Sequence, residues 1–281
     1  MINFTDMKFI AESVWKNDSE FQTDILEGFV KRVRGFSSDL SGLAMQDLIE
    51  DKMFYVPYDT YLVEKVGPQV RESKYGLFRG EFCVLNSRLA IPLRAMDDSV
   101  LGFIGYTNQN DFHQDEASFI KYLYPNKNLF TKSNYLYITR EEYLRALREG
   151  YVCIVDGIFD KRRLQSLGIN ACSLCGSVLT KNQMNYLQMI KHKIVIADND
   201  EAGRKMANYC LYYLDNCVEI RQPDTNDIDD YLKRPENIEK VKEIIVEMKN
   251  EGFLVSHELK GSNKWGTLDH SKYNRPTLRE V

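Results

Sequence analysis

The chain has 281 residues, of which 43% are hydrophobic and 28% are charged, and its formal net charge is −4. A chain of this length can form one large domain or two smaller ones. It contains no apolar run near the ~18 residues that a transmembrane helix requires, and its N-terminus lacks the profile of a signal peptide. The six cysteines lie mostly within apolar runs, which is typical of a reducing compartment. Composition therefore predicts a cytoplasmic protein without a membrane segment.

The first half of the chain is expected to contain helices followed by a β-hairpin. Apolar residues within 1–50 recur at close to the 3.6-residue period of a helix. Two apolar stretches, 88–94 and 100–105, are separated by a short polar turn and predict a hairpin. Arg88 begins this hairpin, where it is either a phosphate contact or an ordinary solvated side chain.

Lysines alternate with aromatic residues between positions 121 and 137, and the lysines of interest are Lys121 and Lys132. This pattern suits a surface that follows a nucleic-acid backbone and stacks its bases. Aromatic residues at the same spacing also suit a hydrophobic core. Composition alone therefore leaves both interpretations open.

From residue 139 onward the sequence alternates between strands and helices. Two capping boxes, Thr139–Glu142 and Thr180–Gln183, open helices, and apolar strands are expected at 152–155, 169–174, 194–197 and 217–220. This alternation is typical of an α/β fold with a parallel sheet and helices on both faces. The expected organisation is a helical segment (1–50), an α+β subdomain with the hairpin (51–138), the parallel-sheet domain (139–235), a C-terminal helix (236–252) and a basic tail (253–281).

Acidic residues follow three of the expected strands, in the pairs Asp156 with Asp160, Asp198 with Asp200, and Asp227 with Asp229. The carboxyl ends of parallel strands meet at one edge of a sheet, so these carboxylates would converge and repel one another. Divalent Mg²⁺ or Mn²⁺ would remove the conflict and could support phosphoryl transfer. The alternative for the middle pair is an acidic helix start, with Asp198 as the N-cap. Gly176 follows a further strand and leaves room for backbone to approach a phosphate.

Two groups of segments resemble a known family. I-V-D-G-I-F-D (154–160), L-C-G-S (174–177), I-A-D-N-D-E-A-G-R (196–204) and N-D-I-D-D-Y-L (226–232) resemble the Toprim domain. The preceding segments R-L-A-I-P-L-R (88–94), L-G-F-I-G (101–105), K-Y-L (121–123) and F-T-K (130–132) are similar to the polymerase core of the bacterial DnaG-type primase. The similar segments occur in the family's order between about residues 50 and 235.

The resemblance implies a DNA primase, a DNA-directed RNA polymerase that synthesises short RNA primers for DNA replication. It implies catalytic roles for Asp156, Asp160, Asp198 and Asp200, and a metal site formed by Asp156, Asp198, Asp200, Asp227 and Asp229. Arg88, Lys121, Lys132 and Gly176 would contact nucleotide or DNA. The implied cofactor is Mg²⁺ or Mn²⁺. The implied partners are single-stranded DNA template, nucleoside triphosphates and a replicative helicase or separate template-recognition module.

Three departures from the family pattern suggest a divergent member, as from a phage. Asp156 replaces a glutamate regarded as general base, Tyr106 replaces an arginine, and the span from Lys121 to Lys132 is one residue short. The only close cysteine pair, Cys172 and Cys175, lies within the expected sheet, so no structural zinc is expected. A metal-dependent Toprim nuclease and a catalytically impaired Toprim module that binds nucleic acid or the replisome remain as alternatives.

Overall fold

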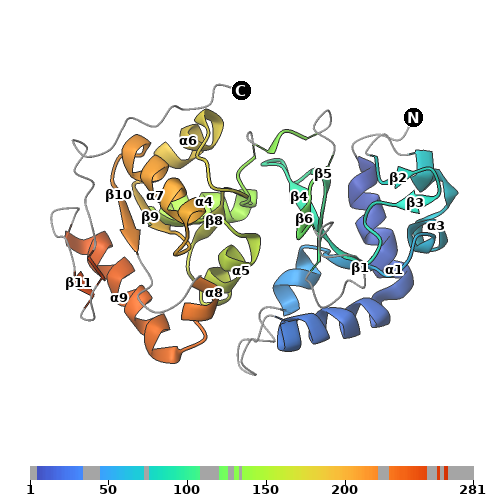
Figure 1. Ribbon diagram of the computed structural model, residues 1–281, viewed down its shortest axis with the longest axis horizontal. Coiled ribbons are helices and arrows are strands. Elements are labelled where there is room, and N and C mark those ends of the chain that lie inside the picture. Colours follow the sequence, from blue (N-terminus) through green and yellow to red (C-terminus); the bar gives the residue numbers. More distant parts are fainter. Residues whose placement is uncertain are drawn as a thin grey trace. The chain divides into compact units, whose positions relative to one another are not determined.

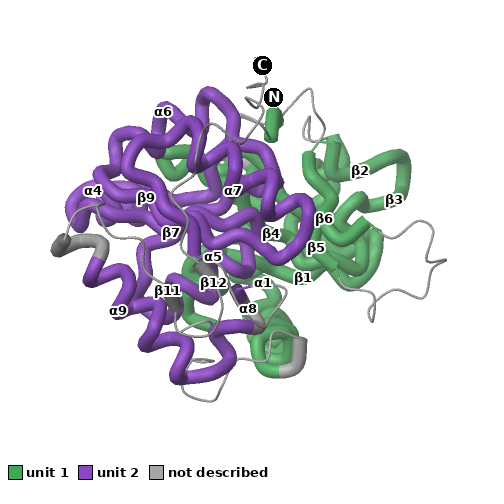
Figure 2. The backbone as a smooth tube through the Cα atoms, turned by 60° about the vertical axis from the view of Figure 1, so that its left-hand side comes forward, with its two compact units in different colours: residues 1–132 green, residues 133–281 purple. Residues whose placement is uncertain are grey.

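The computed structural model describes residues 5–33, 45–72, 76–107, 120–125, 130–132, 135–220, 228–251, 258–259 and 263–264. The chain divides into two compact units, Met1–Lys132 (unit 1) and Ser133–Val281 (unit 2), shown in Figure 2. The sequence placed a domain boundary slightly later, at 138/139. Among the described residues, no helix has the length and apolar character to cross a membrane.

Unit 1 contains an antiparallel sheet in the order β1-β4-β5-β6 (Figure 1). The strands are β1 (Phe54–Val56), β4 (Arg88–Arg94), β5 (Val100–Tyr106) and β6 (Tyr122–Leu123), and a separate hairpin pairs β2 (Phe78–Arg79) with β3 (Phe82–Cys83). The helical elements are α1 (Thr5–Gly28), the π-helical η1 (Phe29–Val33), residues 45–50, α3 (Tyr61–Val66) and the 3₁₀-helical η2 (Pro68–Glu72). The predicted hairpin is confirmed, because β4 and β5 pair from Leu89–Tyr106 to Arg94–Val100.

Helix α1 packs on the sheet of unit 1 and shares its core. The buried stripe of α1 consists of Met7, Ile10, Ala11 and Val14, and it belongs to one hydrophobic cluster with Phe54, Leu62 and Phe103. The indole N–H of Trp15 donates a hydrogen bond to the carbonyl of Met53 at 3.0 Å. The apolar face of α1, which lies within the segment predicted as helical, therefore completes the core of the hairpin subdomain.

Unit 2 contains a four-stranded parallel sheet in the order β10-β9-β7-β8. The strands are β7 (Tyr151–Val155), β8 (Ala171–Ser173), β9 (His192–Ile196) and β10 (Cys217–Ile220). The helices are α4 (Arg140–Glu149), α5 (Ile158–Ser166), α6 (Lys181–Gln188), α7 (Glu201–Tyr213), α8 (Ile228–Tyr231) and α9 (Pro235–Glu251), and β11 (Glu258–Leu259) pairs with β12 (Asn263–Lys264). The predicted α/β fold with a parallel sheet is confirmed.

Helices cover both faces of this sheet. Residues of α5, α8 and α9 share a hydrophobic cluster with alternate residues of the strands, including Cys153, Ile194 and Ile220. Helix α7 contacts β9 and β10 through other buried residues, such as Met206 and Cys210. Because side chains alternate between the faces of a strand, the central strands β7 and β9 are buried on both sides. The five residues of β7 and the five of β9 are all buried.

Both predicted capping boxes are formed. The side chains of Thr139 and Thr180 accept hydrogen bonds from the backbone N–H groups of Glu142 and Gln183, whose side chains bond back to the threonine N–H groups. Gln183 is buried and also donates to the carbonyl of Leu174, just after β8, at 3.1 Å. The cap of α6 therefore also holds the turn that follows β8.

Helix α5 carries a buried ion pair that the sequence did not indicate. The ammonium of Lys161 lies 2.7 Å from a carboxylate oxygen of Glu142 in α4, with 1% and 15% of the two side chains exposed. The guanidinium of Arg162 donates to the hydroxyl of Tyr137 at 3.1 Å. Burial alone would raise the pKa of the Glu142 carboxyl, but the Lys161 charge and hydrogen bonds from Lys161, Thr139 and Gln165 hold this pKa below its usual range.

We expect Glu142→Gln to lower the free energy of unfolding by about 3 kcal/mol, because it leaves the Lys161 ammonium buried without a counter-charge. A depressed pKa in the folded state means that this stabilisation is present above the unfolded pKa of the carboxyl and is lost as pH falls through the folded pKa. Chemical denaturation of wild type should therefore show a loss of stability below about pH 4.5, the ordinary value for glutamate, and Glu142→Gln should show a smaller loss.

The matched control is Glu141→Gln, an exposed position on the same helix. It should change the unfolding free energy by less than about 0.5 kcal/mol. Equal effects of the two substitutions would show that the buried pair contributes nothing specific.

Candidate active site

The carboxyl ends of β7, β9 and β10 are neighbours at one edge of the parallel sheet of unit 2. Strand β9 lies between the other two, with Ile154 paired to Val195 on one side and Ile220 paired to Ile196 on the other. Asp156 directly follows β7, and Asp198 lies two residues beyond β9. Adjacent parallel strands thus bring Asp156 and the Asp198–Asp200 turn to the same edge.

The turn after β9 presents two carboxylates of different exposure. Asp198 is half-buried, whereas Asp200 is exposed. Asp200 is the N-cap of α7, and its Oδ1 accepts a hydrogen bond from the backbone N–H of Gly203 at 2.7 Å. The sequence alternative that made Asp198 the N-cap is wrong, because the helix begins two residues later. Asp200 has one further oxygen with which to bind a cation or substrate.

Gly203 allows α7 to pack against the backbone of this turn. A Cβ atom at position 203 would lie 2.7 Å from the backbone nitrogen of Asp198 and 2.8 Å from its carbonyl carbon. Side chains do not approach backbone atoms so closely, so any residue larger than glycine would force α7 and the turn apart. The glycine therefore keeps both aspartates on a tight strand-to-helix connection.

Asp156 and Asp160 flank the start of α5. The Oδ1 atom of Asp156 is buried, and Asp160 lies in the first turn of α5, where the helix dipole favours a negative charge. The Asp160 carboxylate folds back over Gly157, the N-cap of α5, and occupies the space that a Cβ at 157 would need. The I-V-D-G-I-F-D segment thus requires a glycine at position 157 because the Asp160 carboxylate lies against the backbone there.

Ser173 connects this site to the turn after β8. Its hydroxyl donates to the carbonyl of Asp156 at 2.7 Å and accepts from the backbone N–H of Cys175 at 2.9 Å. Cys175 adopts a left-handed φ of +54°, and half-buried Gly176 follows it. Ser173 could not be predicted from the sequence, because a serine inside an apolar strand belongs to no motif of its own.

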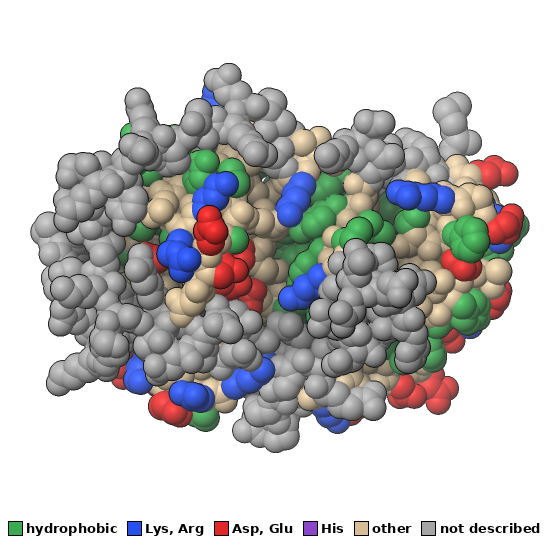
Figure 3. Space-filling view, viewed as in Figure 1, with side chains coloured by type: hydrophobic (Ala, Val, Ile, Leu, Met, Phe, Trp, Pro, Cys, Tyr) green, Lys and Arg blue, Asp and Glu red, His purple; other side chains and the backbone are tan. Residues whose placement is uncertain are grey.

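The structure describes the third acidic pair, Asp227 with Asp229, only in part. Asp227 lies outside the described residues, and Asp229 belongs to α8, for which the structure describes the backbone at this position but not the side chain. Within the described ranges, no group of three or more His, Cys, Asp or Glu side chains is arranged to hold a metal ion. The five-aspartate metal site therefore stays a prediction. Figure 3 shows acidic side chains gathered on the visible face of unit 2, beside lysine or arginine side chains.

The basic residues predicted to contact nucleotide or DNA lie in unit 1. Lys121 and Lys132 are exposed, and each ammonium lies over a tyrosine ring, Tyr122 at 5.7 Å and Tyr124 at 4.3 Å from the ring centroid. Arg88 is instead 8% exposed, and its Nη1 donates to the carbonyl of Ile120 at 2.8 Å. Arg88 thus holds the backbone at Ile120, next to Lys121. The predicted contact between Arg88 and nucleotide stays a prediction.

The substitution Gly203→Ala should lower the free energy of unfolding by about 1–3 kcal/mol, because the added methyl group overlaps the Asp198 backbone. Urea denaturation would measure the change, and Lys205→Ala, at an exposed position of the same helix, is the control that should have little effect. If Gly203→Ala were as stable as wild type, the close packing of α7 on the Asp198 turn would not be required.

Comparison with known proteins identifies relatives of both units. Residues 153–232 match the Toprim-like family. A DNA primase of Aquifex aeolicus is 32% identical over 167 residues, which is 56% of this chain and 31% of that protein. The chain therefore spans about a third of the length of this curated relative.

Solved structures extend the likeness to most of the chain. The zinc-binding and RNA polymerase domains of Aquifex aeolicus primase align over 86% of this chain and 60% of that chain, at 24% identity and a TM-score of 0.64. A DnaG primase catalytic domain bound to ssDNA aligns over 87% of this chain and 80% of that chain, at 20% identity and a TM-score of 0.63. The RNA polymerase domain of Mycobacterium tuberculosis DnaG aligns over 87% and 84%, at 16% identity and a TM-score of 0.64. The fold predicted from the sequence and its resemblance to a DnaG-type primase core with a Toprim segment are both confirmed.

Proposed function

We propose that this chain is a DNA primase, a DNA-templated RNA polymerase that makes short primers by nucleotidyl transfer. The observation that carries the proposal is the pair of neighbouring acidic turns, Asp156 after β7 and Asp198–Asp200 after β9, at the carboxyl edge of a parallel sheet. The similarity to DNA primase in sequence, and to primase polymerase cores in fold, supports the same activity.

A divalent cation is the cofactor that this edge suits best. Carboxylate oxygens are hard ligands preferred by Mg²⁺ and Mn²⁺, and we propose Asp156, Asp198 and Asp200 as ligands together with Asp227 and Asp229. When bound, such cations activate the attacking hydroxyl and stabilise the departing pyrophosphate. Asp160, at the start of α5, adds negative charge beside Asp156.

Zinc is not part of the proposal. Zinc sites use thiolates, and burial raises the pKa of the Cys172 thiol far above its ordinary value. Burial likewise raises the pKa of the Cys153 thiol in the neighbouring strand β7. Cys153 and Cys172 are both buried, and they pack as small apolar side chains.

The substrates follow from the same site and from the lysines of unit 1. We propose single-stranded DNA as template and nucleoside triphosphates as substrates. Lys121 and Lys132 of unit 1 would contact phosphates, and Gly176 of unit 2 would leave room for a phosphate to approach its own backbone. One solved primase core of the same fold is described as bound to ssDNA. A replicative helicase or a separate template-recognition module is proposed as a partner from the resemblance alone.

Purified chain, supplied with single-stranded DNA, ribonucleotides and Mg²⁺, should extend primers, and Asp198→Asn and Asp200→Asn should each lower the rate by at least about a hundredfold. Asparagine keeps the N-cap at position 200, since it is as good a cap as aspartate, so the loss would report charge rather than folding. Asp215→Asn, an exposed acid just before β10, is the control and should retain full activity. Metal-dependent nicking of DNA without synthesis would favour the nuclease alternative.

The substitution Asp156→Glu tests whether the shorter acid impairs the site. We expect it to change the synthesis rate by less than about tenfold, because a bound water or a small shift of the cation compensates for one methylene group. Steady-state primer synthesis measures the rate. A gain of about a hundredfold or more would instead favour the impaired binding module, since the natural chain would then be catalytically weakened.

A further inference from the structure

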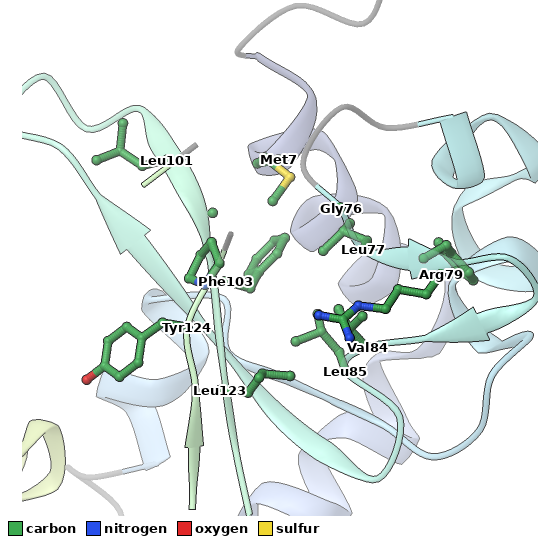
Figure 4. A pocket seen from close by; sticks show the side chains of 13 residues that line it. Met7, Gly76, Leu77, Arg79, Val84, Leu85, Leu101, Phe103, Leu123 and Tyr124 are labelled. Carbon is green, nitrogen blue, oxygen red and sulfur yellow. The ribbon is translucent and has the colours of Figure 1, made fainter. Parts of the chain in front are cut away.

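Unit 1 contains a pocket that the proposed catalytic site does not use. Its cavity volume is about 560 Å³, which lies within the range of about 300–1,000 Å³ of small-molecule sites. Figure 4 shows its walls, which come from the start of α1, the β2–β3 hairpin, β5 and the segment at β6. The lining residues are Met7, Gly76–Arg79, Val84, Leu85, Leu101–Phe103 and Leu123–Pro125.

Two aromatic residues that line the pocket pack against neighbouring side chains. Phe103 packs edge-on against buried Phe54, with ring centroids 5.2 Å apart. The guanidinium of Arg71 lies over Phe78, with its Cζ 5.2 Å from the ring centroid. Rings fixed in this way lose little conformational freedom when a flat group stacks on them, so the walls are prepared for an aromatic ligand.

The charge at the pocket is positive. Among the lining residues that the structure describes, Arg79 is the only ionisable group at neutral pH, and its side chain is exposed. Figure 4 shows its guanidinium turned toward Val84 and Leu85 at the pocket wall. None of these lining residues is an acid. A ligand with one anionic group beside an apolar, flat body would therefore match the pocket.

The pocket is continuous with the lysine-bearing segment of unit 1. Tyr124 lines the pocket, and the ammonium of Lys132 lies 4.3 Å from the centroid of its ring. Two residues earlier, Tyr122 packs on Tyr106 of β5 and lies under Lys121. Figure 3 shows hydrophobic side chains exposed over the region of β4 to β6 with lysine or arginine side chains beside them. Alternating cations and rings suit a polyanion that carries stackable bases.

We propose that this pocket binds one unstacked base of single-stranded DNA, with Arg79 contacting an adjacent phosphate and Lys132 and Lys121 contacting the next phosphates along the strand. The assignment rests on the proposed primase function and identifies where the template is anchored in unit 1. The base stacks on Phe78 or Tyr124, which are both partly exposed, so the pocket recognises a π-surface and tolerates any sequence.

Fluorescence anisotropy of the full chain with a labelled thymidine 12-mer, and with the same oligonucleotide made of abasic sites, tests the proposal. Wild type should bind the base-bearing strand several-fold more tightly than the abasic strand. Leu101→Trp, which fills the pocket from β5, should weaken binding of the base-bearing strand about tenfold and leave the abasic strand unaffected. Arg79→Ala should weaken both strands, and its effect should diminish as salt is raised.

Two matched variants control for bulk and charge. Leu144→Trp places a tryptophan at an exposed leucine of α4, and Arg148→Ala removes an exposed arginine from the same helix. Both should bind like wild type. Because Arg79 is exposed, Arg79→Ala keeps the test valid even if Leu101→Trp does not fold.

The outcomes separate this inference from the proposed function. If wild type binds DNA and makes primers while Arg79→Ala and Leu101→Trp bind normally, the pocket assignment is overturned and the primase function stands. If wild type binds neither strand, both are overturned. Equal binding of the base-bearing and abasic strands by wild type would show that the pocket takes no base.

Discussion

The tight turn from β9 into α7 is the constraint on which the candidate active site depends. The absence of a side chain at Gly203 lets the helix lie against the Asp198 backbone, and the Asp200 cap fixes the first turn of that helix. A looser connection would separate the two carboxylates from the neighbouring strand end that carries Asp156. Carboxylates brought close together cost free energy unless a cation balances them, and this is the physical basis of the proposed divalent-cation site.

The surroundings of this turn are held by buried polar contacts. Ser173 links the ends of β7 and β8, and Gln183 links the turn after β8 to the helix that follows it. The ion pair of Glu142 with Lys161 joins α4 to α5, the helix that carries Asp160. Breaking a buried polar contact costs free energy because its groups are left without partners. These contacts therefore restrict the positions that the acidic loops can adopt.

Unit 1 has a different character near β6, where the ammonium groups of Lys121 and Lys132 lie over the rings of Tyr122 and Tyr124. Its glycines again have packing reasons: a Cβ at Gly105 would lie 2.7 Å from the Arg88 side chain, and one at Gly102 would lie 3.0 Å from Pro125. Gly105 thus lets Arg88 cross β5 and reach the carbonyl of Ile120, next to Lys121. The L-G-F-I-G segment is a support for the proposed nucleic-acid surface.

Local patterns in the sequence were sufficient for the strand–helix alternation, both capping boxes, the β4–β5 hairpin and the placement of acids at strand ends. These features depend on residues that are only a few positions apart, so local helix caps and hydrophobic periodicity are enough to predict them. The burial of the Lys-Arg-Arg run 161–163, the structural engagement of Arg88, the role of Ser173 and the pocket beside Arg79 could not be predicted in this way. Each depends on partners that are at least 17 residues away in the sequence. Only the tertiary structure determines which distant groups come into contact and which charged groups are buried away from solvent.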